Sequence, residues 1–124
     1  MHGAFWLQGG SEIDAAEFFG DGRRDGGLTS YVHRSGSKVG GPRAYSSILG
    51  SGRTPSGGFH IYSVQWSPSG YIFRIDGIRT LTTTSLRSNT PAVMILSLLS
   101  SDYEIPRLRT TNQFMYVDWV RAWR

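Results

Sequence analysis

The dipeptide Asp76-Gly77 stands between two short apolar runs, residues 71–75 and 78–81, and narrows the possible folds more than any other feature. Asp-Gly favours the two-residue turns that join antiparallel strands, because both central residues of such a turn need a positive φ. A third run, residues 59–66, is separated from the first by the turn-forming residues 67–70 (SPSG). The sequence therefore predicts a three-stranded antiparallel meander.

The composition extends this prediction to the whole chain. Its 124 residues include 16 glycines and six tyrosines, but only three glutamates and one lysine. This balance favours strands joined by turns over a helical bundle. Hydrophobic residues make up 39%, which is enough for the core of one domain. We expect residues 1–124 to form a single all-β domain.

Further strands are predicted from short apolar runs at residues 3–8, 11–20, 28–34 and 114–123. Residues 35–58 are rich in Gly, Ser and Pro and are predicted as a loop, with a short strand at residues 44–49. Residues 91–99 are continuously apolar, and this pattern fits a buried strand or a short helix equally well.

Charge and cysteine content exclude several classes of function. The net charge is +4, but 12 of the 13 basic residues are scattered arginines without a run of five like charges, and we predict no nucleic-acid partner. The absence of cysteine excludes disulfides, thiolate metal sites and a cysteine nucleophile. No apolar stretch is long enough to span a membrane. No acidic loop has calcium-ligand spacing, so we predict neither a metal nor a cofactor.

Three carboxylates, Glu12, Asp14 and Glu17, interrupt the apolar run at residues 11–20. In a regular strand Glu12 and Asp14 share one face and Glu17 takes the other. One β-bulge between Asp14 and Glu17 would return all three to one face. Crowded carboxylates raise the pKa of at least one member, and glycoside hydrolysis with retention uses one ionised and one protonated carboxylate. The alternative is an edge strand whose solvated charges discourage aggregation.

These carboxylates also carry a family resemblance. The sequences AFWL at residues 4–7 and EIDAAEF at residues 12–18 resemble the signature of glycoside hydrolase family 16, in the bulged Glu-x-Asp-x-x-Glu form of laminarinases and agarases. Later segments resemble the family's subsequent strands in the same order: residues 59–68, 71–77 and 115–123. The resemblance implies an antiparallel jelly-roll (concanavalin-like) sandwich. Family strands that precede the active site have no counterpart, so we expect the domain to be truncated at its N-terminus.

The resemblance also implies roles for individual residues. Glu12 matches the nucleophile, Glu17 the general acid/base, and Asp14 the assisting residue between them. Trp6 matches an aromatic residue that stacks on a sugar ring, and His33 a histidine that reaches the cleft. The implied activity is endo-acting, retaining hydrolysis of a β-linked polysaccharide, β-1,3-glucan or a related glucan or galactan. It needs no cofactor, and secretion is expected.

Other interpretations remain open. Trp6 fits a core tryptophan, His33 fits a structural histidine, and His60 is predicted to be structural. The chain as a whole also fits a carbohydrate-binding β-sandwich without catalysis, or an inactive remnant with exposed sheet edges. The sequence leaves hydrolysis versus transglycosylation and the oligomeric state undecided.

Overall fold

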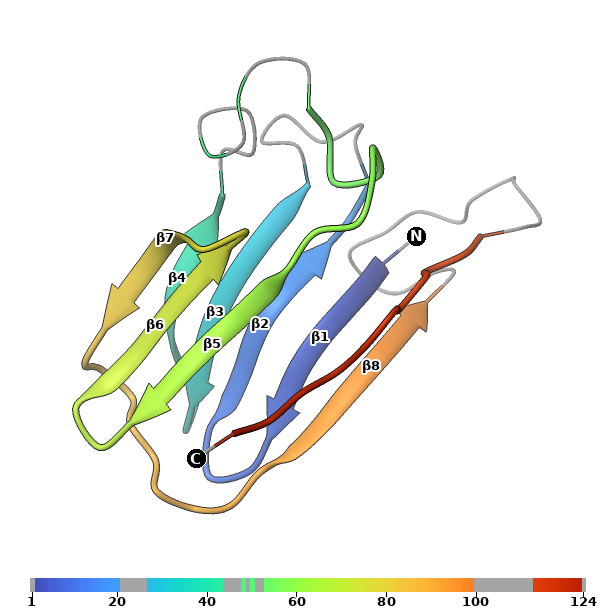
Figure 1. Ribbon diagram of the computed structural model, residues 1–124. Coiled ribbons are helices and arrows are strands. Elements are labelled where there is room, and N and C mark those ends of the chain that lie inside the picture. The colour runs from blue at the N-terminus through green and yellow to red at the C-terminus, as the bar shows by residue number, and fades with distance from the viewer. Residues whose placement is uncertain are drawn as a thin grey trace.

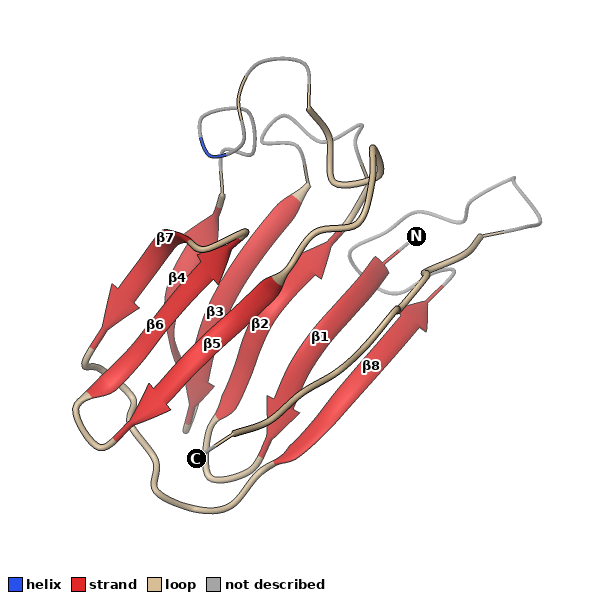
Figure 2. Cartoon of the chain, viewed as in Figure 1, coloured by secondary structure: helices blue, strands red, loops and turns tan. Residues whose placement is uncertain are grey.

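The computed structural model describes residues 2–20, 27–43, 48, 50, 53–99 and 113–123. Within these ranges the chain forms eight strands, and no helix is long and apolar enough to cross a membrane. The strands are β1 (His2–Gln8), β2 (Glu12–Phe18), β3 (Leu28–Arg34), β4 (Ser37–Pro42), β5 (Tyr62–Ser67), β6 (Gly70–Ile75), β7 (Ile78–Thr83) and β8 (Val93–Leu99). Figure 2 shows how strands dominate the described chain.

The strands form two antiparallel sheets that face each other. One sheet has five strands in the order β4-β3-β2-β1-β8, and the other has three in the order β5-β6-β7. Figure 1 shows the three-stranded sheet as a second layer in front of the larger one, with residues 113–123 drawn across β1 and β8. The predicted all-β antiparallel sandwich is confirmed, and so is the meander of β5, β6 and β7.

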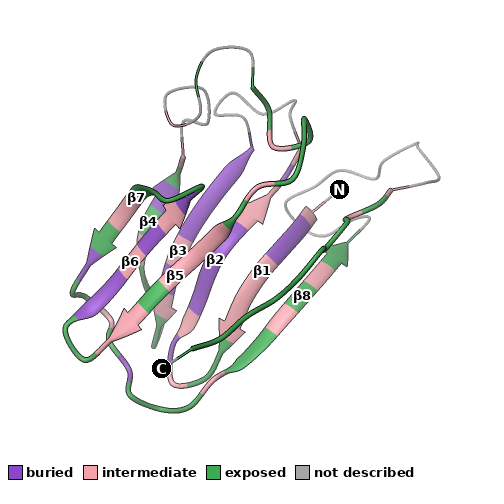
Figure 3. Cartoon of the chain, viewed as in Figure 1, coloured by how far each residue is buried: buried purple, intermediate pink, exposed green. Residues whose placement is uncertain are grey.

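The core lies between the two sheets and fixes which face of β2 and β3 is turned away from it. Ile13 and Val32 of the larger sheet pack against Tyr71 and Phe73 of the smaller one, and all four side chains are fully buried. Figure 3 shows this burial concentrated on β2, β3 and β6. Because side chains alternate along a strand, the neighbours of Ile13 on β2 project to the outer face of the sandwich.

The turn between β6 and β7 has the conformation that its sequence predicts. Asp76 and Gly77 have φ values of 50° and 81°, and the flanking residues Ile75 and Ile78 pair directly across the turn. Positive φ at both central residues matches the right-handed twist of the two strands.

The same aspartate ties this turn to the segment before β5. The Ile61 N–H donates to Asp76 Oδ1 at 2.7 Å, and His60 Nδ1 lies 2.8 Å from Asp76 Oδ2. Partial burial opposes ionisation, but these hydrogen bonds, together with nearby positive charge, hold the pKa of Asp76 below its ordinary value. His60 therefore has the structural contact that was predicted for it.

The structure contains a strand, β4, that the sequence analysis did not predict. The glycines of this segment led to its prediction as a loop. Gly40 has a φ of 140°, and a Cβ there would lie only 2.1 Å from the Ser30 carbonyl oxygen. Glycine is thus what allows β4 to pair closely with β3. The strand predicted at residues 44–49 falls mostly outside the described residues.

Two further apolar segments bear on the strand predictions. One decides between two alternatives, and the other differs from the prediction. Residues 93–99 form strand β8, which pairs with β1 along its full length, so the helical alternative is wrong. Residues 113–123 have no strand assignment, so the predicted closing strand is wrong as a hydrogen-bonded element. Met115 nevertheless approaches Gly3 on the inner face of β1.

Several apolar side chains of β8 and of the C-terminal segment are exposed. Leu96 on β8 and Trp119 on the C-terminal segment are 43% and 46% exposed. Among the described residues, Tyr71 and Phe73 of the three-stranded sheet pack against Ile13 of β2 and Val32 of β3, and Leu7 of β1 borders this cluster. The stability of the fold therefore depends on the core around Tyr71 and Phe73.

We expect Phe73→Ala to lower the free energy of unfolding by about 3–5 kcal/mol, because it removes a fully buried ring. Phe59→Ala is the matched control, since Phe59 is 73% exposed and its loss is expected to change stability by less than about 0.5 kcal/mol. Urea denaturation monitored by circular dichroism measures both. Equal losses in the two variants would contradict this description of the core.

Candidate active site

A β-bulge in β2 is the local feature that builds the site. Along β1 the consecutive residues Phe5 and Trp6 pair with Ala16 and Asp14, so Ala15 is passed over. The pairing of β2 with β3 shifts register within the same segment. The bulge that the spacing of the carboxylates predicted is confirmed.

The bulge places the three carboxylates on one face. On β3 the partners of Glu12, Asp14 and Glu17 are His33, Tyr31 and Thr29. These partners are every second residue of a regular strand and therefore share one face. Residues paired across neighbouring strands point to the same side of the sheet, so the three carboxylates do as well. We call Glu12, Asp14 and Glu17 the carboxylate row.

The row lies in the middle of the sheet. Its strand, β2, is third in the order β4-β3-β2-β1-β8, and Asp14 is only 4% exposed. The alternative of solvated charges that protect an edge strand is therefore wrong.

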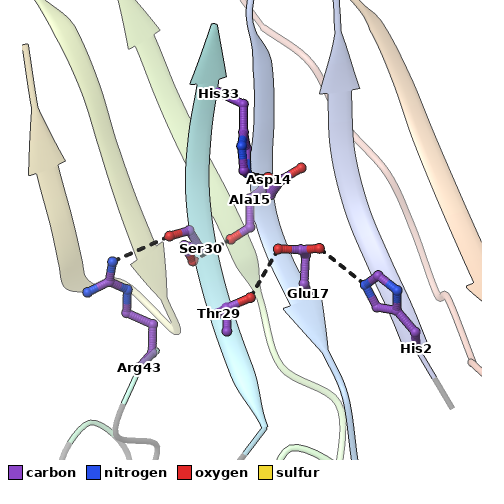
Figure 4. A network of polar contacts seen from close by, with 8 residues as sticks. All are labelled: His2, Asp14, Ala15, Glu17, Thr29, Ser30, His33 and Arg43. Atoms are coloured by element: carbon purple, nitrogen blue, oxygen red, sulfur yellow. Dashed lines mark hydrogen bonds and ion pairs between the residues drawn. The ribbon is translucent and has the colours of Figure 1, made fainter. Parts of the chain in front are cut away.

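Glu17 is held from two sides. Thr29 Oγ1 donates a hydrogen bond to Glu17 Oε2 at 3.0 Å, and His2 Nε2 lies 3.2 Å from Glu17 Oε1. The His2 ring in turn stacks on Phe19, with centroids 4.2 Å apart. Figure 4 shows the carboxylate between its two partners. These contacts fix the orientation of the group.

Sequence reasoning missed both partners of Glu17. His2 lies at an even position of β1, as Trp6 does, and so shares its face. Thr29 is the residue opposite Glu17 on β3. Both contacts could be predicted only from the pairing register of β1, β2 and β3. That register can be worked out only once the position of the bulge is known.

Asp14 is a buried acid beside other acids. Burial is the main cause that raises its pKa to about 8, and repulsion from Glu17 and then Glu12 adds to the effect, while His2 opposes it. The carboxyl group is therefore mostly protonated at neutral pH, and the row carries fewer than three negative charges there.

His33 lies against the same acid. Its Nε2 atom is 3.2 Å from Asp14 Oδ2, and Figure 4 shows the ring directed at Asp14. Asp14 Oδ2 nevertheless accepts no hydrogen bond within the described part of the chain. His33 therefore contacts one of the three carboxylates directly.

Polar contacts support the bulge from β3. Ser30 Oγ donates to the Ala15 carbonyl oxygen at 3.1 Å, and Arg43 Nη2 donates to the Ser30 carbonyl at 3.4 Å. Burial lowers the pKa of Arg43. Because a bulge disrupts regular pairing, the Ser30 hydroxyl supplies a hydrogen bond at the residue that the ladder passes over.

Trp6 borders the row on β1. It pairs with Asp14, and its indole Nε1 donates to Ser97 Oγ on β8 at 3.3 Å. The ring is half-buried and lies on the outer face, so it is not part of the core between the sheets. The structure thus brings Trp6 to the same face as the row and His33.

A pocket of about 380 Å³ opens at the Glu12 end of the row. It lies between the β1–β2 turn and the β3–β4 turn, and its lining includes Glu12, His33 and Lys38. The Lys38 ammonium also sits 5.2 Å from the centre of the Tyr31 ring. The hollow is open to solvent and does not extend to Asp14, Glu17 or Trp6, so Glu12 lies at its border and is reachable from outside.

We expect Asp14→Asn to stabilise the protein increasingly as the pH rises. The folded pKa of about 8 exceeds the ordinary value of 3.8, so the folded wild-type chain holds a proton that the unfolded chain releases, and its stability falls between these values. Asparagine has no such proton. The advantage of the variant should exceed about 1 kcal/mol at mildly alkaline pH and vanish near pH 4.

Thermal or urea unfolding across this pH range measures the effect. The matched control is Asp118→Asn, which makes the same chemical change at an exposed position and should alter stability by less than about 0.5 kcal/mol. A constant difference between Asp14→Asn and wild type at every pH would show that the Asp14 carboxyl is not perturbed.

The chain resembles known proteins in both sequence and fold. Residues 1–121 match the family described as glycosyl hydrolases family 16, and no curated protein matches the chain. A solved structure from work on endo-acting O-glycanases, which prominent members of the human gut microbiota express to initiate mucin breakdown, is similar with a TM-score of 0.51 and 19% identity. The likeness covers 77% of this chain and 46% of that chain, and at this identity it concerns the fold alone. Because the family match covers nearly all residues, the chain belongs to glycosyl hydrolases family 16.

Proposed function

We propose that the carboxylate row hydrolyses O-glycosidic bonds in a β-linked polysaccharide with retention of configuration. The observation that carries the proposal is the bulge, which turns Glu12, Asp14 and Glu17 to one outer face of a central strand. Membership of a glycosyl hydrolase family supports the reaction class. The preferred substrate is a β-1,3-glucan or a related glucan or galactan.

Glu12 is the proposed nucleophile, the role that the family resemblance implies for it, and it borders an open hollow. Its carboxylate attacks the anomeric carbon, and the bond from that carbon to the leaving oxygen breaks as the new ester bond forms. Glu17 donates its proton to the leaving oxygen. In the second step Glu17 accepts a proton from water while the water oxygen displaces Glu12 and restores the free enzyme.

The surroundings of the two glutamates suit these different tasks. Glu17 must keep its orientation while its proton leaves and returns, and Thr29 and His2 hold it on both oxygens. Glu12 must reach a carbon atom, and it lies beside open space. Asp14 stands between them as the assisting residue, in contact with His33.

Trp6 and His33 are the proposed sugar-binding side chains. Trp6 offers a half-buried ring beside the row, and a flat aromatic surface packs well against the apolar face of a sugar. His33 lines the pocket next to Glu12. Since polysaccharides lie outside cells, we propose an extracellular location for the enzyme.

Glu12→Gln and Glu17→Gln are each expected to lower reducing-sugar release by at least about a thousandfold, because each removes one of two carboxylates that act as a unit. The assay uses a panel of β-glucans, galactans and mucin O-glycans. Mucin is included because the similar structure comes from work on mucin O-glycanases. Circular dichroism checks that both variants keep the fold.

An aryl glycoside with a good leaving group separates the two roles. Such a group departs without protonation, so Glu17→Gln should keep the first step and release the aryl alcohol in a burst, whereas Glu12→Gln should not. Sugar binding that survives in Glu12→Gln, together with no reducing-sugar release from the folded wild-type chain, would favour the non-catalytic carbohydrate-binding protein instead.

We expect Thr29→Val to lower kcat by about tenfold with little change in KM, because it removes a hydrogen bond that orients Glu17 while keeping the shape of the side chain. Thr82→Val is the matched control, since Thr82 is exposed on β7 in the other sheet. An equal loss of kcat in both variants would show that Thr29 does not position Glu17.

A further inference from the structure

Part of the site has a geometry that glycoside hydrolysis does not require. Glu12, Asp14 and His33 each offer one potential ligand atom, and these atoms all lie within 4.8 Å of one another. Two of the residues are carboxylates and one is an imidazole. Glu17 is outside this set, because its oxygens face His2 and Thr29.

The backbone fixes the three donors. Glu12 and Asp14 are two residues apart on β2 and share one face. His33 is the direct partner of Glu12 on β3. The three donors lie on two adjacent strands of the five-stranded sheet. They therefore need only side-chain rotation, and no loop movement, to contact one ion.

The contact between His33 and Asp14 already has the spacing of two metal ligands. His33 Nε2 and Asp14 Oδ2 are 3.2 Å apart. Two ligands bound tetrahedrally to one zinc ion at about 2.0–2.1 Å lie about 3.3–3.4 Å from each other. The third donor is within 4.8 Å, so a small rotation of Glu12 completes the set.

Within the described part of the chain, the Asp14 oxygen of this set contacts His33 but has no hydrogen bond. Asp14 Oδ2 is buried and accepts no hydrogen bond from the residues that the structure describes. A buried carboxylate oxygen ordinarily has a hydrogen-bond donor or an ion beside it. Asp14 Oδ2 instead faces an imidazole nitrogen, and a divalent cation between the two would satisfy both.

We propose that Glu12, Asp14 and His33 bind a divalent transition-metal ion, with zinc as the probe, and that the bound ion reversibly inhibits the enzyme. An imidazole with two carboxylates suits zinc, whereas calcium and magnesium prefer all-oxygen sites. The pocket beside Glu12 and His33 leaves room for water as a further ligand. A metal bond to Glu12 withdraws the carboxylate that would attack the sugar.

Metal binding itself is tested without any activity measurement. Isothermal titration of zinc chloride into the chain is done at mildly alkaline pH, because metal ligands must be free of protons. We expect one ion per chain, and at least tenfold weaker binding in both His33→Ala and Asp14→Asn. Asp14→Asn is the safer variant for folding, since an amide replaces a buried acid without a change in size.

Two controls define the ligand set. Glu17→Gln changes a carboxylate of the same row outside the set, and His60→Ala removes the imidazole of the other His–Asp contact, His60 with Asp76. His60→Ala should bind zinc within about twofold of wild type, because His60 contacts Asp76 and not the proposed ligands. Glu17→Gln should still bind one ion per chain, because it removes a charge that acts on Asp14 but no ligand atom. Equal zinc affinity in wild type, His33→Ala and Asp14→Asn would overturn the site, and calcium binding as tight as zinc would overturn its proposed selectivity.

The inhibition rests on the proposed function, whereas the binding does not. If the metal-free chain hydrolyses glycans, zinc should reduce the rate with the same dissociation constant that titration gives, and a chelator should restore it. Zinc binding that leaves hydrolysis unchanged would overturn the inhibition. If the chain binds zinc but hydrolyses no glycan, the proposed metal site would be supported and the proposed function would be contradicted.

Discussion

The bulge at Ala15 is the constraint on which the site depends, because it changes the face of every later residue of β2. In a regular strand that starts from an outward Asp14, Ala16 would point outward and Glu17 would enter the core. With one extra residue, Ala16 instead packs in the core with Leu28 and Ile75, and Glu17 joins the outer face. Two small residues in succession let the chain bend there without a large side chain to place. The bulge thus has two effects at once: it turns Ala16 into the core, and it places Glu17 on the outer face with Glu12 and Asp14.

The row weakens the fold that carries it. Burying Asp14 between two other acids favours its neutral form, and a buried, charged Asp14 would lower the stability of the folded chain. The strand tolerates this because its other face packs tightly: Ile13 and Val32 are buried against the aromatic residues of β6. Functional sites commonly keep such unfavourable groups where many other favourable contacts hold the surrounding structure in place. Here the core on one side of the sheet stabilises the arrangement of charges on the other.

Sequence reasoning reached the parts of this structure that depend on local pattern. The turn at Asp76-Gly77 follows from the φ values that those residues tolerate, and the bulge follows from the parity of the carboxylates on a strand. It missed what depends on pairing between distant segments. His2 and Thr29 meet Glu17 only because β1 and β3 flank β2 in one register. Strand β4 was hidden because its glycines, needed for close approach to β3, read locally as a loop. The family resemblance supplied the roles of Glu12 and Glu17, which no spacing rule contains.

The two ends of the row differ in a way that links the proposed catalysis to the proposed metal binding. Glu17 is enclosed by Thr29 and His2, which contact both of its oxygens and leave it little capacity to bind an ion. Glu12 borders open space, and that freedom would let the proposed nucleophile approach a carbon atom. The same freedom makes Glu12 available to a cation held by Asp14 and His33. The half-buried Glu12, next to a buried acid and an imidazole, is therefore open to both proposed partners, and a sugar and a metal ion would compete for one oxygen.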